Sequence, residues 1–170
     1  MTVLNIEKYG SKVLRQKSQN VNEISKDIKL LANDMLETMY FAKGVGLAAP
    51  QVGKLLRLCV IDVDEKQKSP IVMVNPEVVF GEDKKYLEEG CLSIPSFYEK
   101  VKRFDKVTAK YTGLDGNKKE VCAQGFFAVA IQHEIDHLDA KLFIDYLPGF
   151  KRKIIEKEIK RKRKRKMGDW

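Results

Sequence analysis

The chain has 170 residues, of which 44% are hydrophobic and 33% charged, and its net charge is +8. This length and composition predict one ordinary soluble globular domain. No run of 18 apolar residues is present, which excludes a membrane-spanning helix. The N-terminus lacks the apolar stretch of a secretory signal, and three cysteines without framework spacing indicate a reducing cytoplasm.

The excess positive charge is confined to the C-terminal end. Residues 151–170 hold 11 Lys and Arg against 3 Asp and Glu, so residues 1–150 are neutral overall. We therefore expect a neutral main body over 1–150 and a basic helical extension of the same domain over 151–170. Repulsion between like charges four residues apart predicts that this helix weakens beyond Ile159. A solvated, frayed end is the usual interpretation of such a charge run.

The first predicted elements are a helix followed by two strands. The helix spans Ser25–Ala42, with Ser25 as its N-cap and apolar residues repeating on one face. Aliphatic and β-branched residues predict strands at Leu55–Val63 and Ile71–Asn75. Pro76 is expected to end the second strand, because it has no N–H to donate.

The second half of the chain predicts a hairpin and two helices. Alternating residues over Val107–Gln124 favour a hairpin with its turn at Gly113–Asn117. The stretch Phe126–Leu138 is apolar on nearly every side, which is typical of a central, buried helix. A last helix is expected to begin around Pro148–Phe150. Helices at both ends with strands between them indicate a mixed α+β fold in one domain.

The sequence "IQHEIDHLDA" (residues 131–140) contains both histidines of the chain, His133 and His137. Residues four apart on a helix share a face, so both imidazoles would point at one spot. With Glu134 directly after the first histidine, this is the spacing of a His-Glu-x-x-His metal site, in which the glutamate is a general base. A catalytic site of this kind normally has three protein ligands and one open position.

The third ligand is not evident from this motif alone. The metzincin pattern would place a glycine and another histidine soon after His137, but Ala140 and Phe143 stand there, which excludes it. A thermolysin-like site would use a glutamate from a later helix, either Glu156 or Glu158. Neither glutamate is excluded, although both lie in a strongly charged stretch.

A cysteine is the other possible third ligand. Cys59 lies inside an apolar strand and is expected in the core, while Cys122 lies at the end of the predicted hairpin and stays open. Cys91 lies in "EEGCLSIP", between a glycine and a proline that favour a tight backbone. Its thiolate would be a soft, anionic ligand. The residues by themselves leave the choice between glutamate and cysteine open.

Three stretches resemble the signature motifs of the peptide deformylases: "GVGLAAPQ" (44–51), "EGCLS" (89–93) and "QHEIDH" (132–137). They occur in the family's order, and the resemblance extends from near the N-terminus to about Leu147. It implies antiparallel β-sheets wrapped around the helix with the two histidines, and a C-terminal helix. It also implies one Fe(2+) per chain, replaceable by nickel, cobalt or zinc and held by Cys91, His133 and His137.

The resemblance further implies metal-dependent hydrolysis of the N-formyl group from the formyl-methionine end of newly synthesised polypeptides, releasing formate. Glu134 is expected to carry the proton from water to the leaving amine. The side-chain amide of Gln51 and the backbone N–H of Leu92 are implied as donors to the oxyanion of the tetrahedral intermediate.

Substrate contacts are expected from two glycines that allow close approach of backbone and from residues around the methionine side chain. The residues concerned are Gly44, Val45, Gly46, Glu89, Phe126 and Val129, with Ala130 as a further possible contact. Each apolar member has the core as its alternative location. Tyr98 stands where the commoner family pattern has an arginine, which leaves contacts beyond the methionine open. Ala140 stands where a glycine is often found in the family, so the sequence does not decide whether the family's local turn forms there.

The cationic run Lys160–Lys166 suggests a contact with ribosomal RNA, because the substrates are nascent chains. No membrane partner is expected. An alternative from another class is an RNA-binding module in which the histidines and cysteine form a structural metal site. A structural site normally has four protein ligands, so three ligands beside a glutamate favour an open catalytic site.

Overall fold

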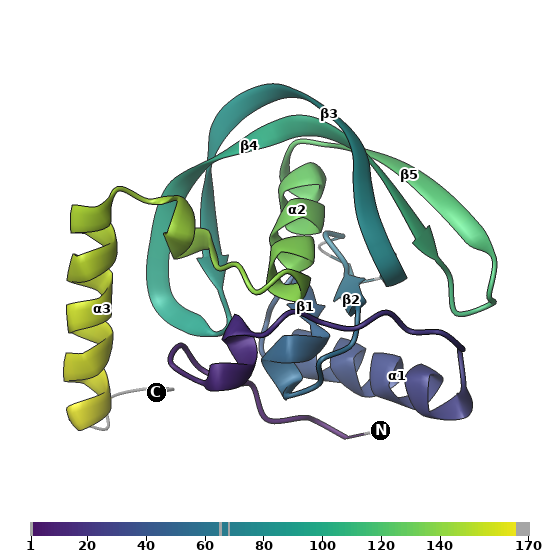
Figure 1. The fold of residues 1–170 in the computed structure, drawn as a ribbon, viewed down its shortest axis with the longest axis horizontal. Helices are drawn as coiled ribbons and strands as arrows, with labels where there is room; N and C mark the ends of the chain where they lie inside the picture. Colours follow the sequence, from purple (N-terminus) through teal and green to yellow (C-terminus); the bar gives the residue numbers. More distant parts are fainter. Residues whose placement is uncertain (1, 65, 68, 166–170) are drawn as a thin grey trace.

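The computed structural model describes residues 2–64, 66–67 and 69–165, which form three α-helices and one five-stranded antiparallel sheet (Figure 1). The strands follow each other across the sheet in chain order. They are β1 (Gly46–Ala48), β2 (Leu58–Ile61), β3 (Ile71–Cys91), β4 (Ile94–Thr112) and β5 (Lys118–Gln124). The α+β class and the antiparallel pairing are confirmed, and the strands form one continuous sheet instead of several.

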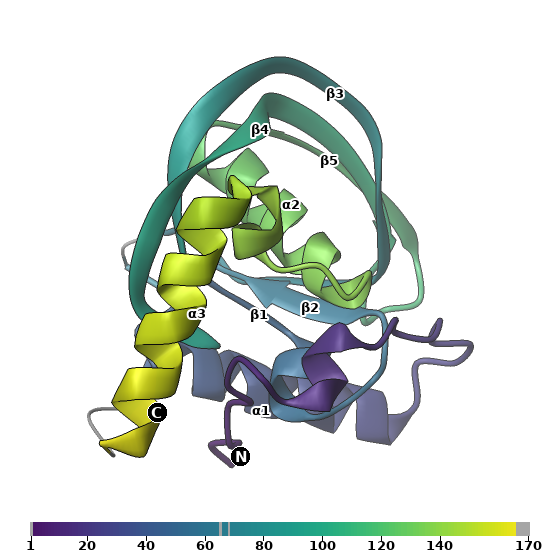
Figure 2. The same ribbon diagram turned by 60° about the vertical axis from the view of Figure 1, so that its left-hand side comes forward.

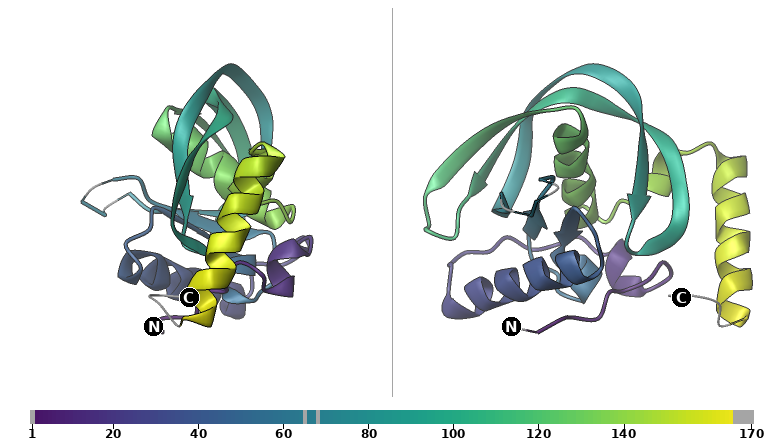
Figure 3. Two further views of the ribbon diagram at one scale, coloured as in Figure 1. Left: turned by 90° about the vertical axis from the view of Figure 1, so that its left-hand side faces the viewer. Right: turned by 180° about the vertical axis from the view of Figure 1, so that it is seen from behind.

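Helix α2 (Phe126–Leu138) lies at the centre of the molecule. The long strands β3 and β4 arch over it together with β5, and β1 and β2 lie beneath it (Figures 1 and 3). Its apolar residues Ala128, Ile131 and Leu138 pack in the same core as Cys59 of β2 and Met73 of β3. The prediction of a central helix is therefore confirmed, and so is the core location of Cys59.

Helix α1 (Lys26–Phe41) covers the other side of β1 and β2. Ser25 caps it, because its side chain accepts a hydrogen bond from the backbone N–H of Ile28 at 3.4 Å. Met35 and Met39 are fully buried in a second core formed with these two strands. Three short 3-10 helices, η1 (Lys12–Arg15), η2 (Ala49–Val52) and η3 (Phe143–Tyr146), complete the connections. No described helix has the length and apolar character needed to cross a membrane.

The prediction that Pro76 ends a strand is wrong, because β3 continues through it to Cys91. The pairing with β4 shifts register between Val74 and Glu77, so the proline lies in a bulge where the ladder requires no donor. Asn75, just before it, adopts a φ of 50°. Its side-chain amide oxygen accepts a hydrogen bond from the backbone N–H of Val21, and its NH2 group donates to the carbonyl of Val21. The bulge thus accommodates the proline inside a long strand.

Helix α3 (Gly149–Lys164) lies against the outside of the β3–β4 arch (Figure 2). Ile155 and Ile159 enter a third core beside Phe143. The helix extends five residues beyond Ile159, to Lys164, and its weakening there stays a prediction. Arg161 pairs with Glu158 at 2.7 Å, which offsets part of the repulsion within the charge run. Lys166 lies outside the described residues.

Candidate metal centre and substrate pocket

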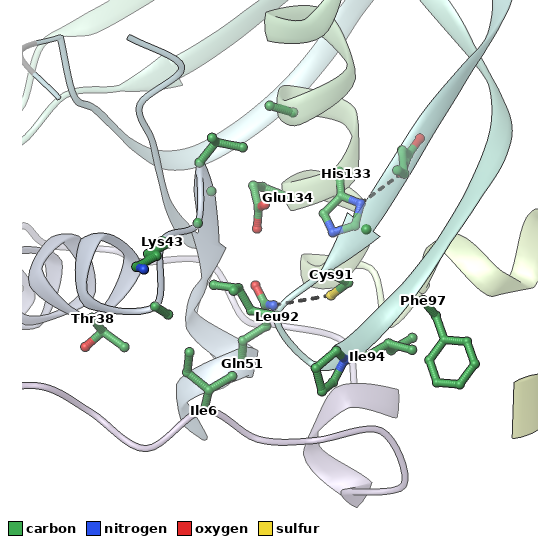
Figure 4. A pocket seen from close by; sticks show the side chains of 18 of the residues that line it. Ile6, Thr38, Lys43, Gln51, Cys91, Leu92, Ile94, Phe97, His133 and Glu134 are labelled. Carbon is green, nitrogen blue, oxygen red and sulfur yellow. Dashed lines mark hydrogen bonds and ion pairs between the residues drawn. The ribbon is translucent and has the colours of Figure 1, made fainter. Parts of the chain in front are cut away.

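Cys91, His133 and His137 bring three ligand atoms to one point. Cys91 is the last residue of β3 and lies beside His133 of α2 (Figure 4). His137 follows His133 by four residues, so it projects from the same face of α2. The two imidazole Nε2 atoms lie 3.2 Å apart, and Cys91 Sγ lies 3.3 Å from His137 Nε2. One ligand atom from each residue falls within 4.8 Å of the others. This convergence joins segments more than 40 residues apart in the chain.

The chemistry of the three donors fits a transition-metal ion. His133 Nδ1 lies 2.9 Å from a carboxylate oxygen of Glu89, so this nitrogen carries the proton and Nε2 presents its lone pair to the common point. Two imidazole nitrogens and a sulfur that face each other in a buried site are poor hydrogen-bond partners for one another, so burying them costs free energy. A cation bound between them offsets this cost. An N, N, S donor set suits Zn(2+), Fe(2+) and related ions.

Glu89 is held by a buried arginine as well as by His133. Arg103 of β4 donates from Nε and Nη2 to the two Glu89 oxygens at 2.6 and 3.0 Å, and from Nη1 to Asp136 at 2.5 Å. Burial by itself raises the pKa of Glu89, but the hydrogen bonds from His133 and Arg103 hold this pKa below its usual value. Glu89 therefore stays ionised and fixes the orientation of His133.

This arrangement differs from the expected role of Glu89 as a substrate contact. The residue lines the pocket, but both of its carboxylate oxygens are engaged within the protein. Arg103 and Asp136 belong to the same network, and no motif assigned either of them a role. The available signal for a buried Arg103 was the alternation of apolar and polar residues along β4, because Arg103 lies on the same inward face as the buried Val101 and Val107.

Glu134 lies beside His133 and faces the pocket (Figure 4). Its carboxyl is buried, and its Oε2 has no hydrogen-bond partner among the described residues. Burial raises the pKa of Glu134 to about 7. Gly46 of β1 packs directly against this carboxylate, and a Cβ at that position would overlap it. The glycine is therefore required by the close approach of Glu134.

The side chain of Gln51 is fixed in one orientation. Its Oε1 accepts a hydrogen bond from the backbone N–H of Ala48 at 2.8 Å. Its Nε2 is consequently turned toward Ser93 Oγ at 3.2 Å and Cys91 Sγ at 3.5 Å (Figure 4). Leu92, next to Cys91 in the turn between β3 and β4, also lines the pocket. The side-chain N–H donor of Gln51 thus lies beside the proposed ligand Cys91, and the backbone N–H of Leu92 directly follows Cys91 in the chain.

The residues expected around the substrate all line one pocket that opens from this centre. Phe126 and Val45 are 57% and 38% exposed, so they form its rim and are not core residues. Val129 is 3% exposed and forms part of the buried wall. Gly44 is packed closely, because a Cβ there would lie 2.7 Å from Leu92 Cδ1. Tyr98 also lines the pocket and is 66% exposed.

The alternative ligands lie elsewhere. Glu156, on α3, accepts hydrogen bonds from Tyr9 Oη at 2.8 Å and Arg152 Nε at 3.1 Å, and Glu158 pairs with Arg161. Cys122 is exposed on β5. Within the part of the chain that the structure describes, the Cys91, His133 and His137 group is the one with ligand geometry. The thermolysin-like alternative is thereby excluded.

Comparison with known proteins gives the family. The model of the polypeptide deformylases matches residues 3–153. A peptide deformylase of Endomicrobium trichonymphae is 64% identical over 170 residues, covering both chains completely. The chain belongs to the polypeptide deformylase family. A relative from Nitrosococcus oceani, also a peptide deformylase, is 46% identical over 96% of this chain and 98% of its own.

Solved structures of the family share the whole fold. The crystal structure of a peptide deformylase from Legionella pneumophila superposes with a TM-score of 0.93 at 41% identity, covering 97% of this chain and 98% of its own. The deformylase of Ehrlichia chaffeensis, in complex with actinonin, gives a TM-score of 0.91 at 37% identity over 95% and 98% of the two chains. The chain is therefore a metal-dependent hydrolase that removes the N-formyl group from the N-terminal formyl-methionine of newly synthesised polypeptides, releasing formate.

Proposed function

We propose that Cys91, His133 and His137 hold the catalytic metal, and that this metal is Fe(2+), with nickel, cobalt or zinc as functional substitutes. The observation that carries the proposal is the convergence of the three donor atoms within 4.8 Å, beside the pocket that contains Glu134. Three protein ligands leave a coordination position for water or substrate. When bound, the metal acts as a Lewis acid and lowers the pKa of a water molecule to about 7.

Glu134 is the proposed proton carrier. It follows His133 on α2, yet it is not a member of the ligand group, and its carboxylate faces the pocket with one oxygen unbonded within the described protein. In this position the carboxylate accepts the proton of the attacking water and then delivers it to the amine nitrogen of the leaving methionine. Packing against Gly46 limits the positions that this carboxylate adopts.

Gln51 Nε2 and the backbone N–H of Leu92 are the proposed donors to the oxyanion. As the oxygen of the attacking water adds to the formyl carbon, the formyl oxygen becomes negative, and donors already fixed in place stabilise this charge without reorganising. The bond from Ala48 to Gln51 Oε1 supplies such fixation, because it turns the N–H group toward Cys91.

The substrate methionine is proposed to lie against Val45, Phe126 and Val129. The exposed rim and buried wall that these side chains form match a flexible, apolar thioether. Gly44 and Gly46 let the substrate backbone approach the protein closely. Tyr98 lines the same pocket, and residues after the methionine are proposed to contact it.

We further propose that residues 1–150 carry the catalysis in the cytoplasm and that the basic segment Lys160–Lys166 of the 151–170 extension contacts ribosomal RNA. The supporting observations are the neutral charge of residues 1–150 and the cationic last turn of α3, formed by residues 161–164. Phosphate contacts by such cations release counterions, which drives binding. Substrates leave the ribosome as nascent chains, so a contact there raises their local concentration.

Metal analysis of anaerobically purified protein tests the ligand assignment. The wild type should contain one iron per chain, and Cys91→Ser should lose nearly all of it, because a hydroxyl is a poor ligand compared with a thiolate. Cys122→Ser is the matched control, since this cysteine is exposed on β5, and it should keep its iron. Retention of iron by Cys91→Ser would reject the assignment.

A further inference from the structure

The N-terminal segment Glu7–Tyr9 is bonded to both loops that carry the proposed oxyanion donors. The backbone N–H of Glu7 donates to the carbonyl of Gln51 at 2.7 Å, and that of Tyr9 donates to the carbonyl of Ser93 at 2.8 Å. Between them, the ammonium of Lys8 donates to the carbonyl of Leu92 at 3.1 Å. Three consecutive residues therefore connect η2 with the turn between β3 and β4.

These bonds act close to the groups that are expected to stabilise the oxyanion. The proposed donor N–H and the carbonyl that Lys8 bonds belong to the same residue, Leu92. Holding the carbonyl therefore restricts rotation of the Leu92 backbone, including its N–H. The backbone of Gln51 is held at its carbonyl by Glu7, and its donor side chain is fixed separately by Ala48. Donors of this kind must lie about 2.7–3.1 Å from the oxyanion. A displacement of about 1 Å is enough to cost on the order of a hundredfold in rate.

The segment is itself anchored to α3 and to η1. Tyr9 packs against the third core, as Cys91 does, and its hydroxyl donates to Glu156 of α3 at 2.8 Å. The guanidinium of Arg15 lies over its ring at 5.8 Å from the centroid. Lys8 thus extends from a fixed backbone, so its ammonium holds the turn against a rigid support.

We propose that Lys8 is a positioning residue for deformylation, which holds the Leu92 amide in the orientation that the oxyanion requires. The inference rests on the proposed roles of Gln51 and Leu92 as donors. Lys8 lines the pocket and is half-buried. Its contribution appears in the transition state, where the oxyanion forms, and much less in binding of the formyl-methionine group.

Lys8→Met tests this role, because methionine keeps much of the apolar stem but has no donor. We expect kcat on a formyl-methionyl peptide to fall roughly tenfold with KM changed less than twofold, the pattern of an interaction made only in the transition state. Lys8→Arg should recover most of the rate, since arginine is able to bond the same carbonyl. Lys12→Met is the matched control: Lys12 is exposed in the neighbouring η1, and kcat should not change.

A second measurement separates positioning from loss of stability. In zinc-loaded, folded Lys8→Met, the amide resonance of Leu92 should shift in the NMR spectrum, while Lys12→Met should leave it in place. Gln51→Ala is measured alongside: if it retains full kcat, the donor assignment itself is wrong. If Gln51→Ala loses activity but Lys8→Met keeps both kcat and the Leu92 resonance, the positioning role is overturned. A rise in KM at constant kcat would overturn it too, by making Lys8 a substrate contact.

Discussion

His133 is oriented by a chain of charged groups that extends away from the pocket. Its Nδ1 is bonded to Glu89, Glu89 is bonded by Arg103, and Arg103 also bonds Asp136, one turn along α2. Hydrogen bonds to the distal nitrogen of a ligand histidine fix its tautomer and raise its basicity. Arg103 and Glu89 are both buried, so removing Arg103 leaves the charge of Glu89 without its ion-pair partner. The metal site therefore depends on residues outside its three ligands.

Glu134→Gln should separate metal binding from catalysis. The amide keeps the shape of the side chain against Gly46 but cannot accept the proton of the attacking water. We expect iron content to stay at the wild-type level while kcat for formate release falls by roughly 10²–10⁴. Loss of iron in step with loss of activity would instead make Glu134 a ligand.

At the residue scale, the sequence was informative where spacing alone defines geometry. His133 and His137 are about one helical turn apart with Glu134 between them, so their shared location followed from the helix. Cys91 depended on resemblance, because no local rule brings a strand end to a helix 40 residues later. Only the alternation of β4 pointed to Arg103, and it was not decisive, since burial of a strand cation is decided by partners on other elements.

At the scale of elements, α2 ends in an unfavourable backbone conformation. Ala140 follows the helix with a φ of 62°, and its N–H bonds the carbonyl of His137 at 3.2 Å. A left-handed residue is common at this position, but it is usually glycine, because a Cβ is crowded there. The sequence left it open whether a turn forms at Ala140. The structure has this turn, at a cost in conformational energy.

Replacing Ala140 with glycine should therefore stabilise the protein by about 1 kcal/mol, seen as a higher midpoint in urea denaturation. Ala42→Gly is the control, because Ala42 follows α1 with a φ of −79° that suits alanine. This second change should leave the stability equal or lower. An Ala140→Gly protein with unchanged or reduced stability would show that the conformation is not strained.

Element boundaries differed from the sequence expectation where tertiary contacts override local signals. β3 passes through Pro76 because a bulge and the Asn75 side chain accommodate it. α3 continues beyond Ile159, where Lys162 lies 4.8 Å from the centroid of the Phe97 ring and Arg161 pairs with Glu158. The contact with Phe97 is a tertiary one that intrinsic propensity does not contain, whereas the pair with Glu158 is local, between residues three apart on α3.

For the whole molecule, charge and catalysis are proposed to reside in different parts. A truncation after Ile159 should abolish binding to ribosomes and leave hydrolysis of a short formylated peptide nearly unchanged. Wild-type binding should weaken with salt, with a log–log slope of roughly −0.7 to −0.9 per phosphate engaged. Replacing the exposed β4 residues Lys100 and Lys102 with glutamine is a control for charge loss alone. Equal binding and salt slope in the truncated protein would leave the tail as a solvated end.

The overall architecture followed from the sequence at the level of class, whereas the arch of β3 and β4 did not. Helix and strand periodicities identify elements one at a time, but the bend of a 21-residue strand over α2 depends on register shifts along the pairing. This bend brings Cys91 at the strand end back to α2. The active centre is therefore a product of the sheet's shape as much as of the three motifs.

The most direct test of the account is formate release as a function of bound metal. Metal-free protein, prepared with a chelator and titrated anaerobically with Fe(2+), should release formate from a formyl-methionyl peptide in linear proportion to bound iron. The rate should reach its plateau at one iron per chain, and Cys91→Ser should stay inactive throughout. Formate release by the metal-free protein, or full activity of iron-treated Cys91→Ser, would contradict a catalytic centre built from Cys91, His133 and His137.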